Sequence, residues 1–501
     1  MRSVRVQLVF GPPAKPPRFG ELGEQISPPL GILYLAAYLR REFSFVDIDV
    51  VDGVRCGYNH TLRRVRDFQP DILGLSFYTT TALGSYKLIN EVKAERPQLL
   101  VIAGGPHVTA IPEDLLLRSA ADLAVMGEGE ETLAELLAAF IEVKGRFSPA
   151  IIRQVNGIAY REDGRIARTM PRSVIRDLDS IPFPARDLID MREYSGWYVH
   201  KRLPETKMIS TRGCPFYCTF CASPVWKTSK PWIRVRSPRN VVDEIEQMMD
   251  AQGIREYMDD CDEFNASLDN AIGICEELKR RKLDIPWKAQ LRAHPLPEEL
   301  VRRMAESGCW YVHLGIESGN NETLKGIQKK ITLDQVVAAC KLLHKYDIKV
   351  MGLFMIYNVW EEDGQLRFED TAMSQRTLDF ADSLLSRKLL DHVNWSITTP
   401  YPGSKLYNIA RRHGLIKQEL TDNWDAWISS DWFVMRWPGI SEAEQARLKT
   451  RGMARKAWLL LKSGNVSPKD LGFFAKKAIK VVATETQSRL QTGRREPQEE
   501  L

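Results

Sequence analysis

Short apolar runs alternate with segments of helical spacing throughout the first 140 residues. Most of the runs end in Gly or Ser, and the segments between them carry apolar side chains three or four positions apart, as on one face of a helix. This alternation predicts an α/β domain with a doubly wound parallel sheet. The predicted strands cover residues 4–10, 45–51, 71–76, 99–105 and 123–127, and the predicted helices cover 30–41, 60–68, 82–95 and 130–141.

A second alternation of strands and helices begins near residue 207. Apolar runs start at residues 207, 254, 287, 309, 350 and 392, and a helix is predicted over 239–252. Six such units predict a partial (β/α)6 barrel of the TIM type, with its active site at the carboxyl ends of the strands.

These patterns divide the chain into four parts. We expect a doubly wound, flavodoxin-like (Rossmann) domain over 1–145, a connector with one hairpin over 146–205, the partial barrel over 206–420 and a mainly helical region over 421–501. The last region is first aromatic and then basic. Its basic stretches are either solvated faces of packed helices or a peripheral membrane contact, and its final dozen residues are expected to be disordered.

Composition narrows the class of protein. With 501 residues, the chain is too long for a single hydrophobic core. Its net charge of +5 is too weak to indicate a nucleic-acid partner. We expect no signal peptide and no spanning helix, because no apolar stretch approaches 18 residues. Eight cysteines without paired spacing predict a reducing, cytoplasmic location.

Three of the cysteines lie within eight positions, in the sequence T-R-G-C-P-F-Y-C-T-F-C-A-S. Cys214, Cys218 and Cys221 have the spacing C-x3-C-x2-C, which lets one tight loop direct three thiolates to an iron–sulfur cluster and leave one iron open. A structural zinc site is the alternative. It needs four ligands, usually as two pairs, and the other five cysteines are scattered singly.

The segment C-P-F-Y-C-T-F-C resembles the signature of the radical S-adenosylmethionine (SAM) enzymes. The resemblance implies that Cys214, Cys218 and Cys221 hold a [4Fe–4S] cluster and that SAM chelates its fourth iron. Reduction of such a cluster cleaves SAM to a 5′-deoxyadenosyl radical. Phe220 matches the family's aromatic position beside the adenine.

Further SAM contacts are expected at the ends of the barrel strands. By resemblance, Asp259 would contact the SAM amino group, although an acidic helix cap is an equal alternative. Gln290 and Arg292 should share one face of a strand, and a guanidinium suits a carboxylate. Glu317 and Ser318 match the family's G-I-E-S-G near the SAM ribose or amino acid end. The segment 357–360 replaces the family's usual glycine–proline turn.

The first domain is similar to the cobalamin-binding domain that precedes one large class of radical SAM enzymes. The similarity lies in P-P-L-G-I-L-Y-L-A-A-Y-L, L-G-L-S, A-G-G-P-H and M-G-E-G-E-E-T. It implies that turns after the strands hold the nucleotide tail. No D-x-H-x-x-G motif follows the first strand, so we expect no histidine on cobalt; His107 matches the tail pocket instead. The candidate cobalamin residues are Ser76, Thr79, Gly104, Gly105, Pro106, His107, Gly127, Glu128 and Gly129.

Together the two resemblances cover about 420 residues and imply a cobalamin-dependent radical SAM methyltransferase. One SAM would supply the methyl group through methylcobalamin, and a second would supply the radical that activates an unactivated carbon. The alternatives are oxidative cyclisation or ring rearrangement without methyl transfer, and a non-catalytic sensor. The expected partners are a small-molecule, lipid or peptide natural-product substrate and a reductant such as flavodoxin or ferredoxin.

Overall fold

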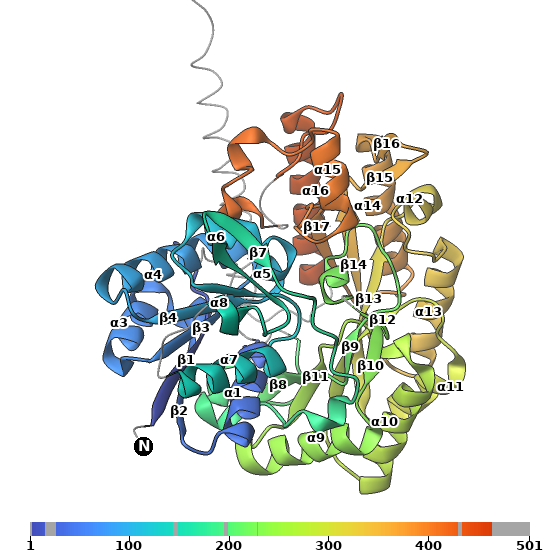
Figure 1. Cartoon of the computed structure of the whole chain (residues 1–501). Helices are drawn as coiled ribbons and strands as arrows, with labels where there is room; N and C mark the ends of the chain where they lie inside the picture. The colour runs from blue at the N-terminus through green and yellow to red at the C-terminus, as the bar shows by residue number, and fades with distance from the viewer. Residues whose placement is uncertain are drawn as a thin grey trace, which may run out of the picture.

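The computed structural model describes residues 3–15, 27–143, 149–194, 199–227, 229–428 and 433–462 of the chain. Figure 1 shows two α/β units side by side, with the N-terminal unit in blue and teal and the second in green to yellow. A C-terminal segment in orange lies against both units. The connector between the units contributes short 3-10 helices at Leu178–Ser180, Arg186–Leu188 and Met191–Tyr194.

The first sheet has seven strands within the described residues, in the order β2-β1-β3-β4-β5-β6-β7. The first five are parallel, as predicted, and their order 2-1-3-4-5 is that of flavodoxin-like folds. The predicted hairpin of the connector adds the two antiparallel edge strands. The strands are β1 Val4–Phe10, β2 Val46–Asp52, β3 Ile72–Ser76, β4 Leu100–Gly104, β5 Leu123–Val125, β6 Ile158–Glu162 and β7 Arg165–Arg168.

Helices cover both faces of this sheet, because its strands bury side chains on both sides. Leu8 and Ile102 pack toward one layer of helices, whereas Val9 and Val101 pack toward the other. The first layer is α1 Leu30–Glu42 and α7 Glu130–Glu142; the second includes α3 Tyr58–Phe68, α4 Ala82–Glu95 and α6 Pro112–Arg118. Shorter helices are α2 Gly53–Cys56, α5 Pro106–Ala110 and α8 Pro149–Ile152.

The second sheet has six strands in the described part of the chain, all parallel, in the order β17-β14-β13-β12-β11-β8. This is the predicted partial barrel. Its strands are β8 Glu205–Met208, β11 Glu256–Asp259, β12 Trp287–Arg292, β13 Cys309–Glu317, β14 Lys349–Ile356 and β17 His392–Ile397. Its helices are α9 Pro238–Gln252, α10 Leu268–Arg281, α11 Glu298–Glu306, α12 Asn321–Gly326, α13 Leu333–Lys345, α14 Thr371–Ser386 and α15 Lys405–Arg412.

The segment predicted as one first barrel strand is split in two. β8 ends at Met208, and β9 (Thr211–Gly213) leaves the sheet to pair with β10 (Ile233–Val235). Gly213 has φ +87°, and a Cβ there would lie 2.2 Å from the Trp232 carbonyl oxygen. A glycine is therefore required directly before Cys214, where the chain turns into the cysteine loop.

The sequence at 357–360 leads into a hairpin. β14 ends at Ile356, and β15 (Val359–Glu362) pairs with β16 (Gln365–Phe368). Asp363 and Gly364 connect them, both with positive φ, as a tight hairpin turn requires. The chain therefore forms this hairpin where the resemblance led us to expect a glycine–proline turn.

The C-terminal segment completes the core of the first unit. Trp424 and Trp427 pack among the side chains of α4 and β3, which lie more than 300 residues earlier in the sequence. α16 (Glu442–Lys462) then packs against α14 and β17. The predicted basic stretch at 473–482 and the tail lie outside the described residues. None of the helices in the described ranges combines the length and apolar character needed to cross a membrane.

Candidate functional site

A cavity of about 300 Å³ lies between the two units. On one side it is lined by the turns that follow β3, β4 and β5, and on the other by β9, Arg234 and the residues after β11. The turns of the first unit and the residues after β11 lie at the carboxyl ends of parallel strands, where ligands bind in open α/β sheets and in barrels. The two sheets therefore direct their ligand-binding edges into one space.

Glycines form the wall of the cavity on the side of the first unit. Gly105 has φ +94°, and a Cβ there would lie 2.7 Å from Ser76 Oγ. At Gly129 a Cβ would lie 3.1 Å from the side chain of Leu35. At these glycines the wall is backbone, which a large planar cofactor can approach closely, whereas apolar side chains such as Leu8 and Ile102 line the rest of this side. The predicted cobalamin residues that line the cavity are Ser76, Gly104, Gly105, Gly127, Glu128 and Gly129.

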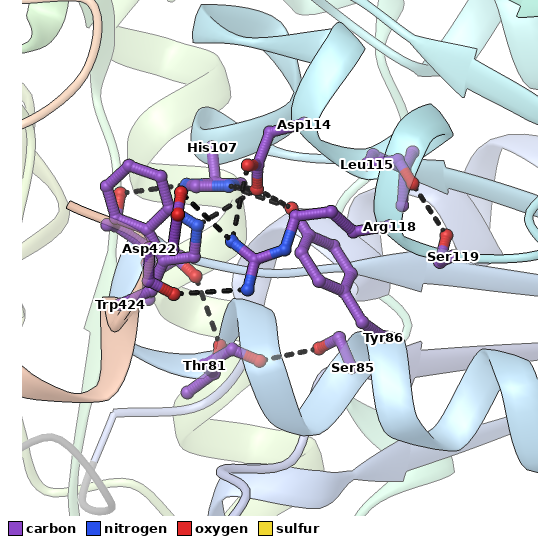
Figure 2. A network of polar contacts seen from close by, with 12 residues as sticks. Thr81, Ser85, Tyr86, His107, Asp114, Leu115, Arg118, Ser119, Asp422 and Trp424 are labelled. Carbon is purple, nitrogen blue, oxygen red and sulfur yellow. Dashed lines mark hydrogen bonds and ion pairs between the residues drawn. The ribbon is translucent and has the colours of Figure 1, made fainter.

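The other three predicted cobalamin residues, Thr79, Pro106 and His107, do not line this cavity. His107 is 1% exposed, and both its ring nitrogens have protein partners (Figure 2). Nδ1 lies 3.2 Å from Thr79 Oγ1, and Nε2 lies 2.9 Å from the Tyr86 hydroxyl. Asp114 accepts from Tyr86 at 2.7 Å and from the Trp424 indole at 2.9 Å. The structure thus places His107 where the C-terminal segment docks on the first unit.

Burial lowers the pKa of His107. Asp114, which favours a protonated imidazole, raises this pKa by a smaller amount. In the unfolded chain His107 takes up a proton near pH 6.5, whereas in the folded protein it takes up that proton only at a lower pH. Stability is therefore lost as pH falls below about 6.5. We expect His107→Gln to show a smaller drop in melting temperature between pH 7.5 and 5.5 than the wild type, by thermal unfolding. Equal drops in both proteins would contradict this account.

An ion-pair network crosses the cavity from one unit to the other. Glu128 lies 3.2 Å from Arg212 and 2.8 Å from Arg234, and it accepts from the Ile175 backbone N–H at 2.9 Å. Glu130 lies 2.6 Å from Arg212. Burial alone would raise the pKa of Glu128, but the two arginines hold it below its ordinary value. The carboxylate predicted to contact cobalamin therefore joins the units.

Sequence reasoning missed Arg212 and Arg234. Arg212 lies two residues before Cys214, on β9, and Arg234 lies opposite it on β10. The available signal was the pair of arginines in short strands on either side of the cysteine loop. Their carboxylate partners are more than 80 residues away in sequence, and no local pattern indicates them.

The cysteine loop is held by backbone hydrogen bonds from two other segments. Thr219 N–H donates to the Ile327 carbonyl at 2.9 Å, and Leu406 N–H donates to the Thr219 carbonyl at 2.8 Å. The three cysteines are each partly buried. Within the ranges that the structure describes, no three His, Cys, Asp or Glu side chains already converge as a metal site. The ligand set therefore stays a prediction from the spacing.

The donor set of the loop fits an iron–sulfur cluster. Burial raises the pKa of Cys214 to about 12 and also raises that of Cys221. Thiolates are therefore disfavoured here without a bound cation, and a metal cluster would supply that charge. Arg292 Nη1 lies 3.8 Å from Cys218 Sγ, and the Arg292 side chain is 2% exposed.

Arg292 also carries hydrogen-bond donors suited to a carboxylate ligand. Its guanidinium lies 4.0 Å from the centre of the Phe216 ring. Its Nε and Nη2 atoms are buried and have no hydrogen-bond partner among the described residues. Unpaired buried donors are costly in a folded protein, and a bound carboxylate, such as that of SAM, would satisfy both.

The acidic strand ends differ in their placement. Asp259 is 2% exposed and accepts from the backbone N–H groups of Ser210 and Cys261, at 3.1 and 3.3 Å. Its neighbour Asp260 lines the cavity instead and accepts from Gln290 at 2.6 Å. Successive residues of a strand point to opposite sides, so a SAM contact from this strand would come from Asp260 rather than Asp259.

The remaining predicted SAM residues lie in two settings. Glu317 lies 2.9 Å from Lys329. Lys329 in turn interacts electrostatically with Cys218 of the cysteine loop. Ser318 is fully buried and donates to Glu369 at 2.6 Å, on the side of α14. Phe220 is half-buried and packs against two hydrophobic clusters. A role in SAM binding stays a prediction for each of them.

Comparisons with known proteins agree with this architecture. Residues 23–137 match the family model of the B12 binding domain, and residues 208–366 match that of the radical SAM superfamily. A protein of Pyrococcus horikoshii, named an uncharacterized methyltransferase, is 32% identical over 90% of this chain and 93% of its own length. The anaerobic magnesium-protoporphyrin IX monomethyl ester cyclase of Rubrivivax gelatinosus is 28% identical over 78% of this chain and 68% of its own.

A solved structure shares the fold. It is the cobalamin-dependent SAM radical enzyme OxsB with aqua-cobalamin bound, with a TM-score of 0.68 and 21% identity over 97% of this chain and 71% of that one. The fold and the site thus define a radical SAM protein with an N-terminal B12-binding domain. The chain belongs to this family of cobalamin-dependent radical SAM enzymes.

Proposed function

We propose that the protein is a methyltransferase that uses cobalamin, SAM and a [4Fe–4S] cluster to methylate an unactivated carbon. One observation carries the proposal: a single cavity is lined both by the glycine turns of the first sheet and by residues next to the cysteine loop. Groups held by the two walls would face each other with the substrate between them, as transfer of a methyl group to a substrate radical requires. The name of the Pyrococcus relative supports this class of reaction.

The residues of one wall would bind the cluster and SAM, and those of the other wall would bind cobalamin. When bound, the cluster and SAM supply a radical that removes a hydrogen atom from the substrate, and cobalamin supplies the methyl group. Arg292 would hold the SAM carboxylate and Asp260 would face its cationic end. The remaining assignments are Cys214, Cys218 and Cys221 for the cluster and Ser76, Gly104, Gly105, Gly127 and Gly129 for cobalamin.

Radical chemistry without methyl transfer is the second candidate, favoured by the likeness to the Rubrivivax cyclase. The products of SAM separate the two without knowledge of the substrate. Transfer of its methyl group leaves S-adenosylhomocysteine, whereas reductive cleavage leaves 5′-deoxyadenosine and methionine. We expect reduced, cobalamin-loaded protein to form both nucleoside products, quantified by mass spectrometry. Formation of 5′-deoxyadenosine without S-adenosylhomocysteine would favour the cyclase reaction, and formation of neither would exclude both.

A further inference from the structure

An aromatic pair lies at the surface of the cysteine loop. Tyr217, directly before Cys218, is 41% exposed, and its ring meets that of Trp232 edge to face at 5.1 Å. Lysine ammonium groups flank both rings. Lys227 Nζ lies 3.9 Å from the centre of the Tyr217 ring, and Lys230 Nζ lies 5.2 Å from that of Trp232. The loop thus exposes an aromatic surface with positive charge beside it.

The segments that hold the loop bring a further lysine to this surface. In the amide orientation that suits its neighbours, with oxygen and nitrogen exchanged, the Gln328 side chain donates to the Tyr217 carbonyl at 3.1 Å and accepts from Lys405 Nζ at 3.3 Å. Lys230 and Lys405 are both exposed. We call Tyr217, Trp232, Lys230 and Lys405 the cysteine-loop surface.

The positive charge of the cysteine-loop surface has no ion-pair partner among the residues that the structure describes. Neither Lys230 nor Lys405 forms an ion pair there. Elsewhere, exposed cations commonly have acidic partners, as Arg66 has Glu95 and Lys279 has Glu306. Unpaired lysines produce a positive potential that increases the rate of encounter with an acidic protein and orients it.

We propose that the cysteine-loop surface is the docking site for an acidic, flavodoxin-type electron carrier. The inference rests on the proposed function, which needs one electron for each reductive cleavage of SAM. The carrier's fully reduced flavin would lose one electron and become a semiquinone, and the oxidised cluster would gain that electron. A flavin ring edge exposed on the carrier suits contact with Tyr217 and Trp232. Tyr217 is covalently adjacent to the cluster ligand Cys218, so the contact is also close to the electron's destination.

The test compares two reductants on one protein. We expect the double variant Lys230→Glu/Lys405→Glu to be reduced by photoreduced flavodoxin at least about tenfold more slowly than the wild type at low salt. The loss should shrink as salt screens the surface charges. Dithionite, a small inorganic reductant, should reduce both proteins at the same rate. Cluster reduction is followed by stopped-flow absorbance and by electron paramagnetic resonance.

The matched control is Lys349→Glu/Lys388→Glu, which changes the same net charge near the opposite, amino ends of β14 and β17. Both of its lysines are exposed. Flavodoxin should reduce this control at the wild-type rate. Equal rates for all three proteins, or equal slowing in the two double variants, would overturn the proposal. The rate of cluster reduction can be measured even if S-adenosylhomocysteine never forms. Failure of the docking site and failure of the proposed function are therefore distinguishable.

Discussion

Cys218→Ala is expected to abolish cluster binding and with it the cleavage of SAM. A cluster held by three thiolates loses a third of its protein ligands, and Arg292 Nη1 loses the sulfur that lies 3.8 Å from it. Iron content, the visible absorption of the cluster and the formation of 5′-deoxyadenosine should all fall to background after anaerobic reconstitution.

Cobalamin binding should survive this substitution. The candidate cobalamin residues come from the first sheet, whereas Cys218 lies in a loop of the second unit. Cobalamin affinity, measured by visible titration, is therefore expected to stay within about threefold of the wild type. The matched control is Cys56→Ala, which removes a thiol outside the loop and should retain both cofactors. Loss of cobalamin together with the cluster in Cys218→Ala would contradict the separation of the two sites.

Glu128→Ala should have the second large effect, because it breaks the ion-pair network between the units. Arg234, with a side chain only 3% exposed, would lose its carboxylate partner, and Arg212 would keep only Glu130. Removing one partner of a buried ion pair costs about 3–5 kcal/mol. We expect a loss of this size in the free energy of unfolding of the apo-protein, measured with denaturant. Cobalamin affinity should fall at least about tenfold, since the cavity needs both walls in place.

Glu131→Ala provides a control three residues further along the chain, in the first turn of α7. Glu131 pairs with Arg172 at 3.3 Å, and its side chain is 41% exposed. Exposed pairs contribute less than about 1 kcal/mol, so this variant should resemble the wild type in stability and in cobalamin affinity. If the two variants behaved alike, the network would not join the units in the way described.

Secondary structure could be predicted almost throughout, because it is encoded locally. The predicted first strand, 4–10, coincides with β1, and the predicted helix 82–95 coincides with α4. Apolar side chains at period two or near 3.6 are sufficient to indicate which residues a sheet or a helix buries. Two segments were exceptions: at 207–213, Gly213 and the pairing with β10 take the chain out of the sheet, and at 359–368 the chain forms the β15–β16 hairpin.

Side-chain partners were harder to predict, because they depend on packing between distant segments. Asp259 was the predicted SAM contact, and the structure buries it while Asp260 lines the cavity. Alternation along β11 already indicated this difference, since Tyr257, two residues before Asp259, belongs to the helix-facing core; a SAM contact stays a prediction for both carboxylates. For His107 no local signal existed. Its environment includes Trp424, which reaches it only after the C-terminal segment has folded back onto the first unit.

The order of the two α/β units and the place of the cysteine loop between strands of the second unit follow from local sequence alone. A cysteine spacing of three and two residues is a property of the chain before it folds, as is hydrophobic periodicity. The tertiary structure alone decided which charges face each other across the cavity. Glu128 and Arg212 are 84 residues apart, and only the docking of one parallel sheet edge against the other turns them into a pair.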